Sequence, residues 1–177
     1  HPCLQCLDLN GNKSGLLASR ALGGLLNSSM SLKKLDLSFQ TSDERLDIPL
    51  LSESLRHNTI LKTLDLSSCQ LDDEDAEILG RLFCETTSLR DLFVARNKIS
   101  DEGINTLAGM LPGIKGLKRL SLWGNPFDEE GAKSLSLGLE TNFELEDVNL
   151  FRNFPCSDRI IYYTQLNRAG RRLMYAT

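Results

Sequence analysis

The stretch Leu89-Arg-Asp-Leu92-Phe-Val94-Ala-Arg-Asn97 carries the pattern that decides the fold, and it returns 28 residues later as Leu117-Lys-Arg-Leu120-Ser-Leu122-Trp-Gly-Asn125. Less regular copies lie on both sides, at intervals of 28 or 29 residues, and begin at Leu4, Leu32, Leu61 and Leu145. A period of roughly 20 to 50 residues is typical of solenoids, whose units contact only their neighbours. The sequence therefore predicts one domain of six repeats over residues 1–156.

Each copy changes its hydrophobic period along its length. It opens with apolar residues at alternate positions, which favours a short strand with one buried face, and then adopts the spacing of a helix. A leucine stands eighteen positions after the first leucine in the first five copies, and we expect it to face the core: Leu22, Leu50, Leu79, Leu107 and Leu135. The unit is strand, loop, helix, and the fold class is an α/β solenoid.

The ninth position of each copy falls where the strand turns away and leaves backbone groups that need partners. Short side chains that donate and accept hydrogen bonds suit this turn. We predict that the residues at this position stack into a structural ladder rather than contact a ligand: Asn12, Gln40, Cys69, Asn97, Asn125 and Asn153.

Acidic clusters stand where three of the helices should start, at residues 72–75, 101–102 and 128–130. Carboxylates in a first helical turn are stabilised by the helix dipole and by free N–H groups, by about 0.3–1 kcal/mol each. We interpret the clusters mainly in this way. The alternative is an acidic ridge that attracts a basic partner.

These repeats resemble the leucine-rich repeat family, and within it the ribonuclease-inhibitor-like subtype, in segments such as 97–103 and 125–131. The resemblance covers essentially the whole chain and implies a horseshoe with a parallel concave sheet and convex helices. Family members serve as inhibitors, immune sensors, small-GTPase regulators and assembly subunits, so the fold alone does not give the function. Repeat 2 departs from the pattern at residues 40–45 and carries Pro49 within its expected helix, which we expect to start late or be distorted.

Residues 157–177 do not form another repeat. Ile160, Tyr163 and Leu166 continue a helical face, and arginines follow, so we predict a C-terminal capping helix with a basic tail. No matching cap precedes Leu4. We therefore expect preceding repeats or another subunit to cover the N-terminal end.

On the concave face, equal positions of successive repeats become neighbours about 4.8 Å apart. One row starts with Asp8, Asp36 and Asp65, whose repulsion we expect Lys34 and Lys62 to offset, the alternative being a cation or basic ligand. The last three repeats gather aromatic and arginine side chains, the usual composition of a binding hot spot. We predict that partner binding uses these residues, although they could merely cover one another: Phe93, Arg96, Arg119, Trp123, Phe151 and Arg152.

Other chemistry has little support in the sequence. The net charge is −4, with 16 basic and 23 acidic side chains in residues 1–156, which argues against nucleic-acid binding. No apolar stretch approaches a membrane span. Cys3-x-x-Cys6 beside His1 is only half of a zinc motif, and neither histidine belongs to a recognisable nucleophile motif. We predict no metal, no cofactor and no catalysis.

The sequence thus favours a non-catalytic protein-binding module or scaffold that recognises a partner protein through its concave face. Two alternatives stay open: a structural subunit buried in a larger complex, and a regulator of a small GTPase. An intracellular location is favoured over secretion, because five scattered cysteines do not indicate a disulfide framework.

Overall fold

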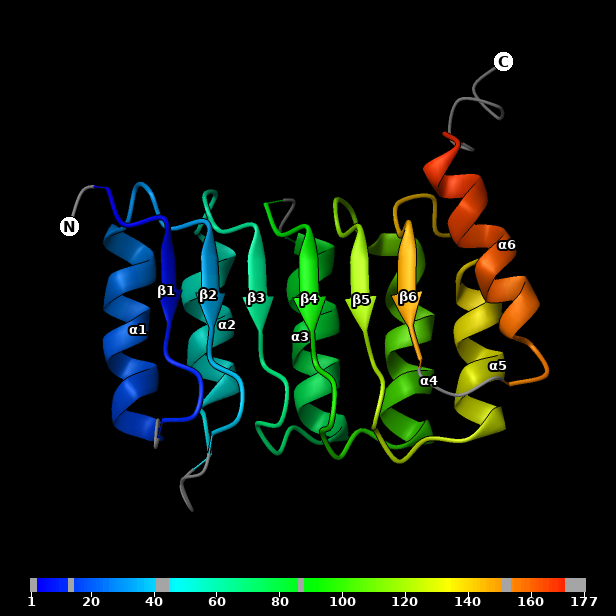
Figure 1. Ribbon diagram of the computed structural model, residues 1–177, viewed down its shortest axis with the longest axis horizontal. Coiled ribbons are helices and arrows are strands. Elements are labelled where there is room, and N and C mark those ends of the chain that lie inside the picture. Colours follow the sequence, from blue (N-terminus) through cyan, green and yellow to red (C-terminus); the bar gives the residue numbers. More distant parts are fainter. Residues whose placement is uncertain (1–2, 13–14, 41–44, 86–87, 151–153, 171–177) are drawn as a thin grey trace.

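A computed structural model describes residues 3–12, 15–40, 45–85, 88–150 and 154–170. Its strands form one parallel sheet in which each strand pairs with the next along the chain (Figure 1). Each repeat contributes a strand of three residues: β1 Cys6–Asp8, β2 Lys34–Asp36, β3 Thr63–Asp65, β4 Asp91–Phe93, β5 Arg119–Ser121 and β6 Asp147–Asn149. The sequence prediction of an α/β solenoid is confirmed.

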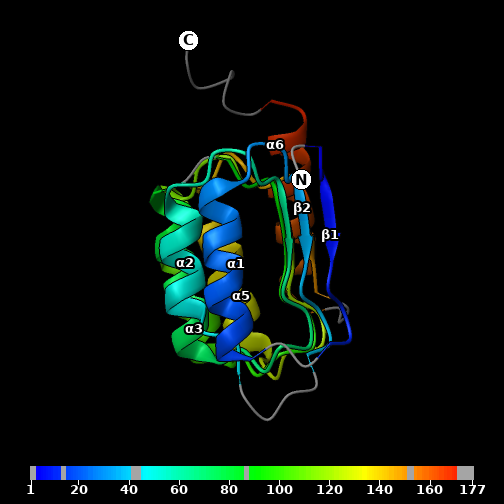
Figure 2. The same cartoon turned by 90° about the vertical axis from the view of Figure 1, so that its left-hand side faces the viewer.

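The helices of the first five repeats form a second layer on one side of the sheet, and the other side of the sheet faces away from them (Figure 2). Helix α6 instead packs against β6 and α5 at the end of the row. The helices are α1 Leu16–Ser28, α2 Ile48–Arg56, α3 Asp73–Glu85, α4 Asp101–Met110, α5 Glu129–Gly138 and α6 Ser157–Arg168, with a 3₁₀ turn η1 at Leu111–Gly113.

The core lies between these layers and consists mainly of leucines that recur once per repeat. The middle residue of each inner strand, such as Leu64 and Leu120, is at most 2% exposed, and the helical leucine is buried in four of the five expected cases. Within the described residues, no helix is long and apolar enough to cross a membrane.

The exception is repeat 2, where the expectation for Leu50 is wrong: this side chain is only half-buried, and Leu51 takes the core position. Repeat 2 is one residue longer than its neighbours, and the extra residue precedes its helix. As expected, α2 starts late, at Ile48, with Pro49 in its first turn, where no backbone N–H is needed. Asp47 caps this start by accepting the N–H of Leu50 at 2.9 Å.

Candidate functional site

The sheet register produces the row of side chains that the repeat spacing predicts on the helix-free face. The pairs run from Asp8 through Asp36 and Asp65 to Phe93, and then to Ser121 and Asn149. This face is therefore divided into an acidic half over β1–β3 and a half without carboxylates in this row over β4–β6.

The three aspartates of this row are not neutralised in the way we expected. Among the described residues, no ion pair joins Lys34 or Lys62 to them. Instead, one oxygen each of Asp8, Asp36 and Asp65 accepts the backbone N–H two residues further on, at 2.9–3.0 Å. These local hydrogen bonds stabilise each carboxylate within its own repeat.

In the other half, Arg96 lies over the ring of Trp123. Its guanidinium carbon is 4.3 Å from the ring centroid, and the backbone N–H of Arg96 donates to the Trp123 carbonyl at 2.8 Å. A cation–π contact of this kind contributes about 0.5–1 kcal/mol at an exposed site. Arg96 is exposed and Trp123 is half-buried, so the pair presents a planar, charged surface to solvent.

The backbone explains why Arg96 takes this position. The eighth residue of each of repeats 1 to 5 has a positive φ, between 53° and 77°: Gly11, Phe39, Ser68, Arg96 and Gly124. This left-handed turn directs the Arg96 side chain across the next repeat. There, a Cβ on Gly124 would lie only 3.0 Å from the Arg96 Cγ, so the glycine leaves the space that Arg96 uses.

A hollow of about 520 Å³ adjoins the Arg96–Trp123 pair, with Trp123 as one of its walls. Its apolar lining also includes Pro126, Phe127, Leu150 and Phe154, and the two phenylalanine rings stack with centroids 5.7 Å apart. Sequence analysis did not select Phe127 or Phe154. Their only signal was their position just after the ladder residues of repeats 5 and 6.

The other residues of the predicted binding surface do not take part in the contact between Arg96 and Trp123. Phe93 is half-buried on β4, in register with Ser121. Arg119, at the start of β5, makes two hydrogen bonds of 2.6 and 2.8 Å to the carboxylate of Asp91 on β4. Arg119 and Trp123 are four residues apart, up to roughly 13 Å in an extended chain. Phe151 and Arg152 lie outside the described residues.

Asp91 is the first residue of β4, and it is buried, with only 6% of its surface exposed. Burial alone would raise its pKa, but hydrogen bonds from Arg119 and from Thr63, the latter at 3.0 Å, outweigh burial and hold the pKa below its usual value. The Arg119 guanidinium is thus engaged in a structural ion pair that joins β4 and β5.

The ladder position shows hydrogen bonds that run between repeats. Asn97 accepts the N–H groups of Cys69 and Leu71 at 2.9 and 3.1 Å, and donates to the carbonyls of Leu66 and Val94 at 3.0 and 2.9 Å. Asn125, Gln40 and Cys69 also donate to a carbonyl of the preceding repeat, whereas exposed Asn12 donates to Leu9 and Asn10 of its own repeat. Asn153 lies outside the described residues.

A second series of asparagines, which sequence analysis missed, joins the repeats at the opposite end of the strands. The amide groups of Asn58 and Asn142 donate to carbonyls of the preceding repeat at 2.7 Å, and their oxygens accept two N–H groups of their own loops. Asn167 of α6 donates to Asn142 and Leu145. Asparagine three residues before the first leucine of repeats 3 and 6 was the available signal.

Acidic residues at the starts of α3 and α4 connect repeats 3, 4 and 5. The Asp73 carboxylate accepts the N–H and the hydroxyl of Ser100, and Asp101 accepts the N–H groups of Asp128 and Gly131 at 2.9 and 2.8 Å. A carboxylate thus caps the helix of the following repeat as well as lying in the first turn of its own.

The cysteines differ in accessibility, and this gives a direct chemical prediction. Cys69 is 3% exposed and burial raises the pKa of its thiol to about 12, whereas Cys3 and Cys6 are exposed. Because the thiolate is the reactive form, we expect iodoacetamide at about pH 8 to modify Cys3 and Cys6 in the folded protein, and Cys69 only after unfolding. Peptide mass spectrometry measures this, and equal labelling of Cys69 in the folded protein would contradict it.

Comparison with known proteins gives matches inside this repeat array. The leucine rich repeat family model matches residues 57–80 and 86–108. Mouse NACHT, LRR and PYD domains-containing protein 12 is 34% identical over 124 residues, which cover 68% of this chain and 12% of that protein. Human leucine-rich repeat-containing protein 73 is 30% identical over 145 residues, 80% of this chain and 44% of that protein. The chain thus spans less than half the length of these relatives.

Two solved structures have the same arrangement of strands and helices. One is described as leiomodin-1 actin-binding site 2, with a TM-score of 0.65 at 16% identity, and covers 73% of this chain and 76% of that one. The other is the tropomodulin C-terminal domain of Caenorhabditis elegans, with a TM-score of 0.64 at 16% identity, and covers 99% and 90%. At this identity they show the fold alone. With its stacked repeats and these matches, the chain is a leucine-rich repeat protein.

Proposed function

We propose that the chain is a non-catalytic protein-binding module that recognises a partner protein on the helix-free face of its sheet, at the surface formed by Phe93, Arg96, Trp123 and the adjoining hollow. The observation that carries the proposal is the stacking of Arg96 on Trp123 beside an apolar hollow, on a face that no helix covers.

The chemistry of this surface suits a protein ligand. Tryptophan and arginine are among the residue types most enriched at the energetic centres of interfaces. The indole buries a large area with only two rotatable bonds, and the guanidinium presents planar hydrogen-bond donors and stacks on aromatic rings. The hollow, at about 520 Å³, can take a bulky apolar side chain beside the indole ring. The surface is also preorganised, since buried Asn97 and Asn125 fix the strand ends beneath it.

The description of one similarly folded structure fits this class of function. One neighbour is described as an actin-binding site of leiomodin-1, which is a protein-binding role for a similarly folded unit. Its low identity gives no reason to transfer actin as the partner. The proposal therefore names a protein ligand and a surface.

We expect Trp123→Ala to reduce partner capture at least about tenfold, the effect of losing one hot-spot side chain. The measurement is affinity capture from the native source with quantitative mass spectrometry, followed by titration of each captured protein. Trp123 is the single tryptophan of the chain, so binding at this surface should also shift the wild-type fluorescence emission.

The matched control is Leu137→Ser, which removes an exposed apolar side chain from α5 on the opposite, helical face, where Leu137 is 48% exposed. It should change capture less than about twofold. Thermal unfolding of both variants checks that the fold is intact. Capture that is unaffected by Trp123→Ala, or reduced equally by Leu137→Ser, would overturn the proposal.

A further inference from the structure

A row of basic side chains crosses the sheet at the end where its strands begin, which we call the basic edge. The row consists of the residues at the second position of repeats 2 to 5: Lys33, Lys62, Arg90 and Lys118. The backbones of these residues are hydrogen-bonded one to the next, with N–H to carbonyl distances of 2.8, 2.8 and 2.7 Å. The backbones of neighbours in the row are therefore one strand spacing apart, about 4.8 Å.

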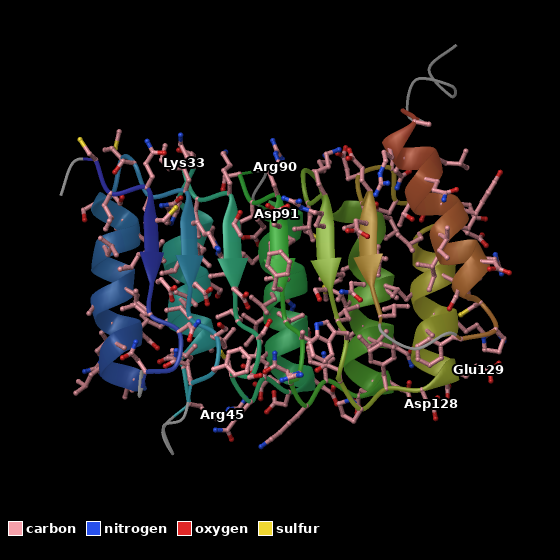
Figure 3. All side chains as sticks on the ribbon, in the orientation of Figure 1. Lys33, Arg45, Arg90, Asp91, Asp128 and Glu129 are labelled. Atoms are coloured by element: carbon pink, nitrogen blue, oxygen red, sulfur yellow. The ribbon has the colours of Figure 1, made fainter. Side chains whose placement is uncertain are left out.

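This edge is opposite in charge to the other edge of the sheet. Figure 3 shows Lys33 and Arg90 at the end where the strands begin, and Asp128 and Glu129 at the end where the helices begin. The carboxylates Asp73 and Asp101 of that second edge are occupied by backbone N–H groups of the next repeat. The two edges thus differ in the kind of partner that they can attract.

The basic edge is also hollowed. Two depressions, of about 570 and 300 Å³, share Lys62 and Arg90 in their linings. The larger one extends past Lys118 and Arg119 to Arg168 of α6, and the smaller one extends to Arg56 of α2. Lys33 lines neither depression but is hydrogen-bonded through its backbone to Lys62, which lines both. We call the two depressions together with Lys33 the basic groove.

Several of the positive charges in the basic groove have carboxylate partners, and others do not. Lys118 lies 3.2 and 3.0 Å from Glu144 and Glu146, and Arg56 lies 2.9 Å from Glu85. Within the described part of the chain, Lys33 and Lys62 form no ion pair, although they are adjacent in the row. Adjacent like charges destabilise a sheet, and an anionic ligand would relieve this.

We propose that the basic groove binds an acidic segment, rich in aspartate and glutamate, of a partner protein. Carboxylates of such a segment would pair with Lys33 and Lys62, and its backbone would occupy the two depressions. The row lies at the start of the strands, whereas Trp123 lies beyond the end of β5, so this contact does not depend on the surface of the proposed function.

Charge and shape favour an acidic protein segment over nucleic acid or membrane. Asp91, Glu146 and Asp147 also line the larger depression and repel any anion beside them. A nucleic acid carries a phosphate at every nucleotide, whereas a protein segment can place neutral residues beside these carboxylates and its own carboxylates beside Lys33 and Lys62. The chain as a whole has a net charge of −4, which disfavours a long polyanion or an anionic surface. A short segment can follow the groove between these carboxylates.

The test uses a fluorescein-labelled peptide in which glutamate alternates with serine, with fluorescence anisotropy at about 0.15 M salt, where charges more than about 8 Å apart are largely screened. We expect the double variant Lys33→Glu with Lys62→Glu to raise the Kd at least about tenfold, since it reverses two charges at the contact. The matched control is Arg20→Glu with Lys133→Glu, which reverses two exposed charges on helices α1 and α5. It gives the same net charge and should change the Kd less than about twofold.

Equal weakening in both double variants would show an effect of net charge only and would overturn the proposal, as would wild-type affinity in the Lys33 and Lys62 variant. Tighter binding of duplex DNA, or of phosphatidylserine vesicles, at the same concentration of negative charge would contradict the choice of partner. Salt-sensitive dimerisation of the wild type that the row variant abolishes would assign the groove to a second copy instead. Circular dichroism melting of each variant confirms that it is folded.

Discussion

Replacing Asn97 with alanine is expected to lower the free energy of unfolding by about 4 kcal/mol. The Asn97 side chain is 7% exposed and bonds two N–H groups and three carbonyls, which belong to two successive repeats. A buried polar group that loses its partner costs about 1–3 kcal/mol, and alanine offers none of these groups a replacement. Urea unfolding followed by circular dichroism measures the change.

The control for this prediction is the same substitution at Asn12, which holds the same repeat position. Asn12 is exposed and, among the described residues, donates only to Leu9 and Asn10 of its own repeat, at 2.9 and 3.3 Å, so Asn12→Ala should cost less than about 1 kcal/mol. Similar losses at the two positions would mean that the hydrogen bonds between repeats are not what stabilises the central part of the solenoid.

Replacing Gly138 with alanine is expected to destabilise the protein by about 2 kcal/mol, although alanine is the better helix former. A Cβ at Gly138 of α5 would lie 2.5 Å from the Ala108 carbonyl oxygen and 2.9 Å from the Leu111 Cδ1. The first of these atoms is backbone of α4 and cannot rotate away. The two helices must therefore move apart, and overpacking of this kind typically costs about 1–3 kcal/mol.

Gly109 provides the matched control, because it lies near the end of α4 as Gly138 does near the end of α5. A Cβ at Gly109 meets no atom within 4 Å. Gly109→Ala should therefore show helix propensity alone and stabilise the protein by up to about 1 kcal/mol. Opposite signs of the two changes in the urea midpoint are the expected result, and stabilisation by both substitutions would show that α4 and α5 are not in close contact.

Both predictions concern contacts between successive repeats, namely the hydrogen bonds of Asn97 and the packing of α5 on α4. The first of these contacts also affects the proposed binding surface. Asn97 lies directly after Arg96, so the same turn that fixes the ladder also directs the arginine over Trp123. Loss of Asn97 should thus disturb the Arg96–Trp123 pair, whereas Gly138, between the helices, is remote from the helix-free face. Partner binding and stability can be separated by comparing these variants with Trp123→Ala.

The repeat spacing was enough to predict which residues become neighbours on the sheet. Because each unit stacks on the last without a shift, residues 28 or 29 positions apart must pair, and the register from Asp65 to Phe93 to Ser121 follows. The same regularity led to the error at Leu50. One additional residue before α2 moves every later helical position by one, and the spacing alone does not tell on which side of the helix the insertion lies.

The proposed binding surface could be predicted only in part from the sequence. Phe93 and Trp123 could be placed on one face from their positions, but the partner of an arginine depends on where its long side chain ends. Arg96 stacks on an indole ring, whereas Arg119 is hydrogen-bonded to a buried carboxylate. The sequence shows only two arginines near the strands of adjacent repeats and does not distinguish these two partners. The ribonuclease-inhibitor-like subtype and the capping role of residues 157–177 stay predictions from the pattern.

By itself the sequence determined the repeating unit and the position of the ladder, because each depends only on local period and on stacking of identical units. The parallel sheet was expected from the resemblance to the leucine-rich repeat family. Tertiary structure alone decided that Arg96 covers Trp123, that Phe127 and Phe154 line a hollow beside them, and that Lys33 and Lys62 have no carboxylate partner among the described residues. These features depend on distances of a few ångströms between side chains of different repeats. Packing of the helices and the left-handed turn at Arg96 set those distances. Glycine at the eighth position indicates such a turn in repeats 1 and 5, but the arginine at the same position of repeat 4 does not, and its conformation is imposed by the neighbouring repeats.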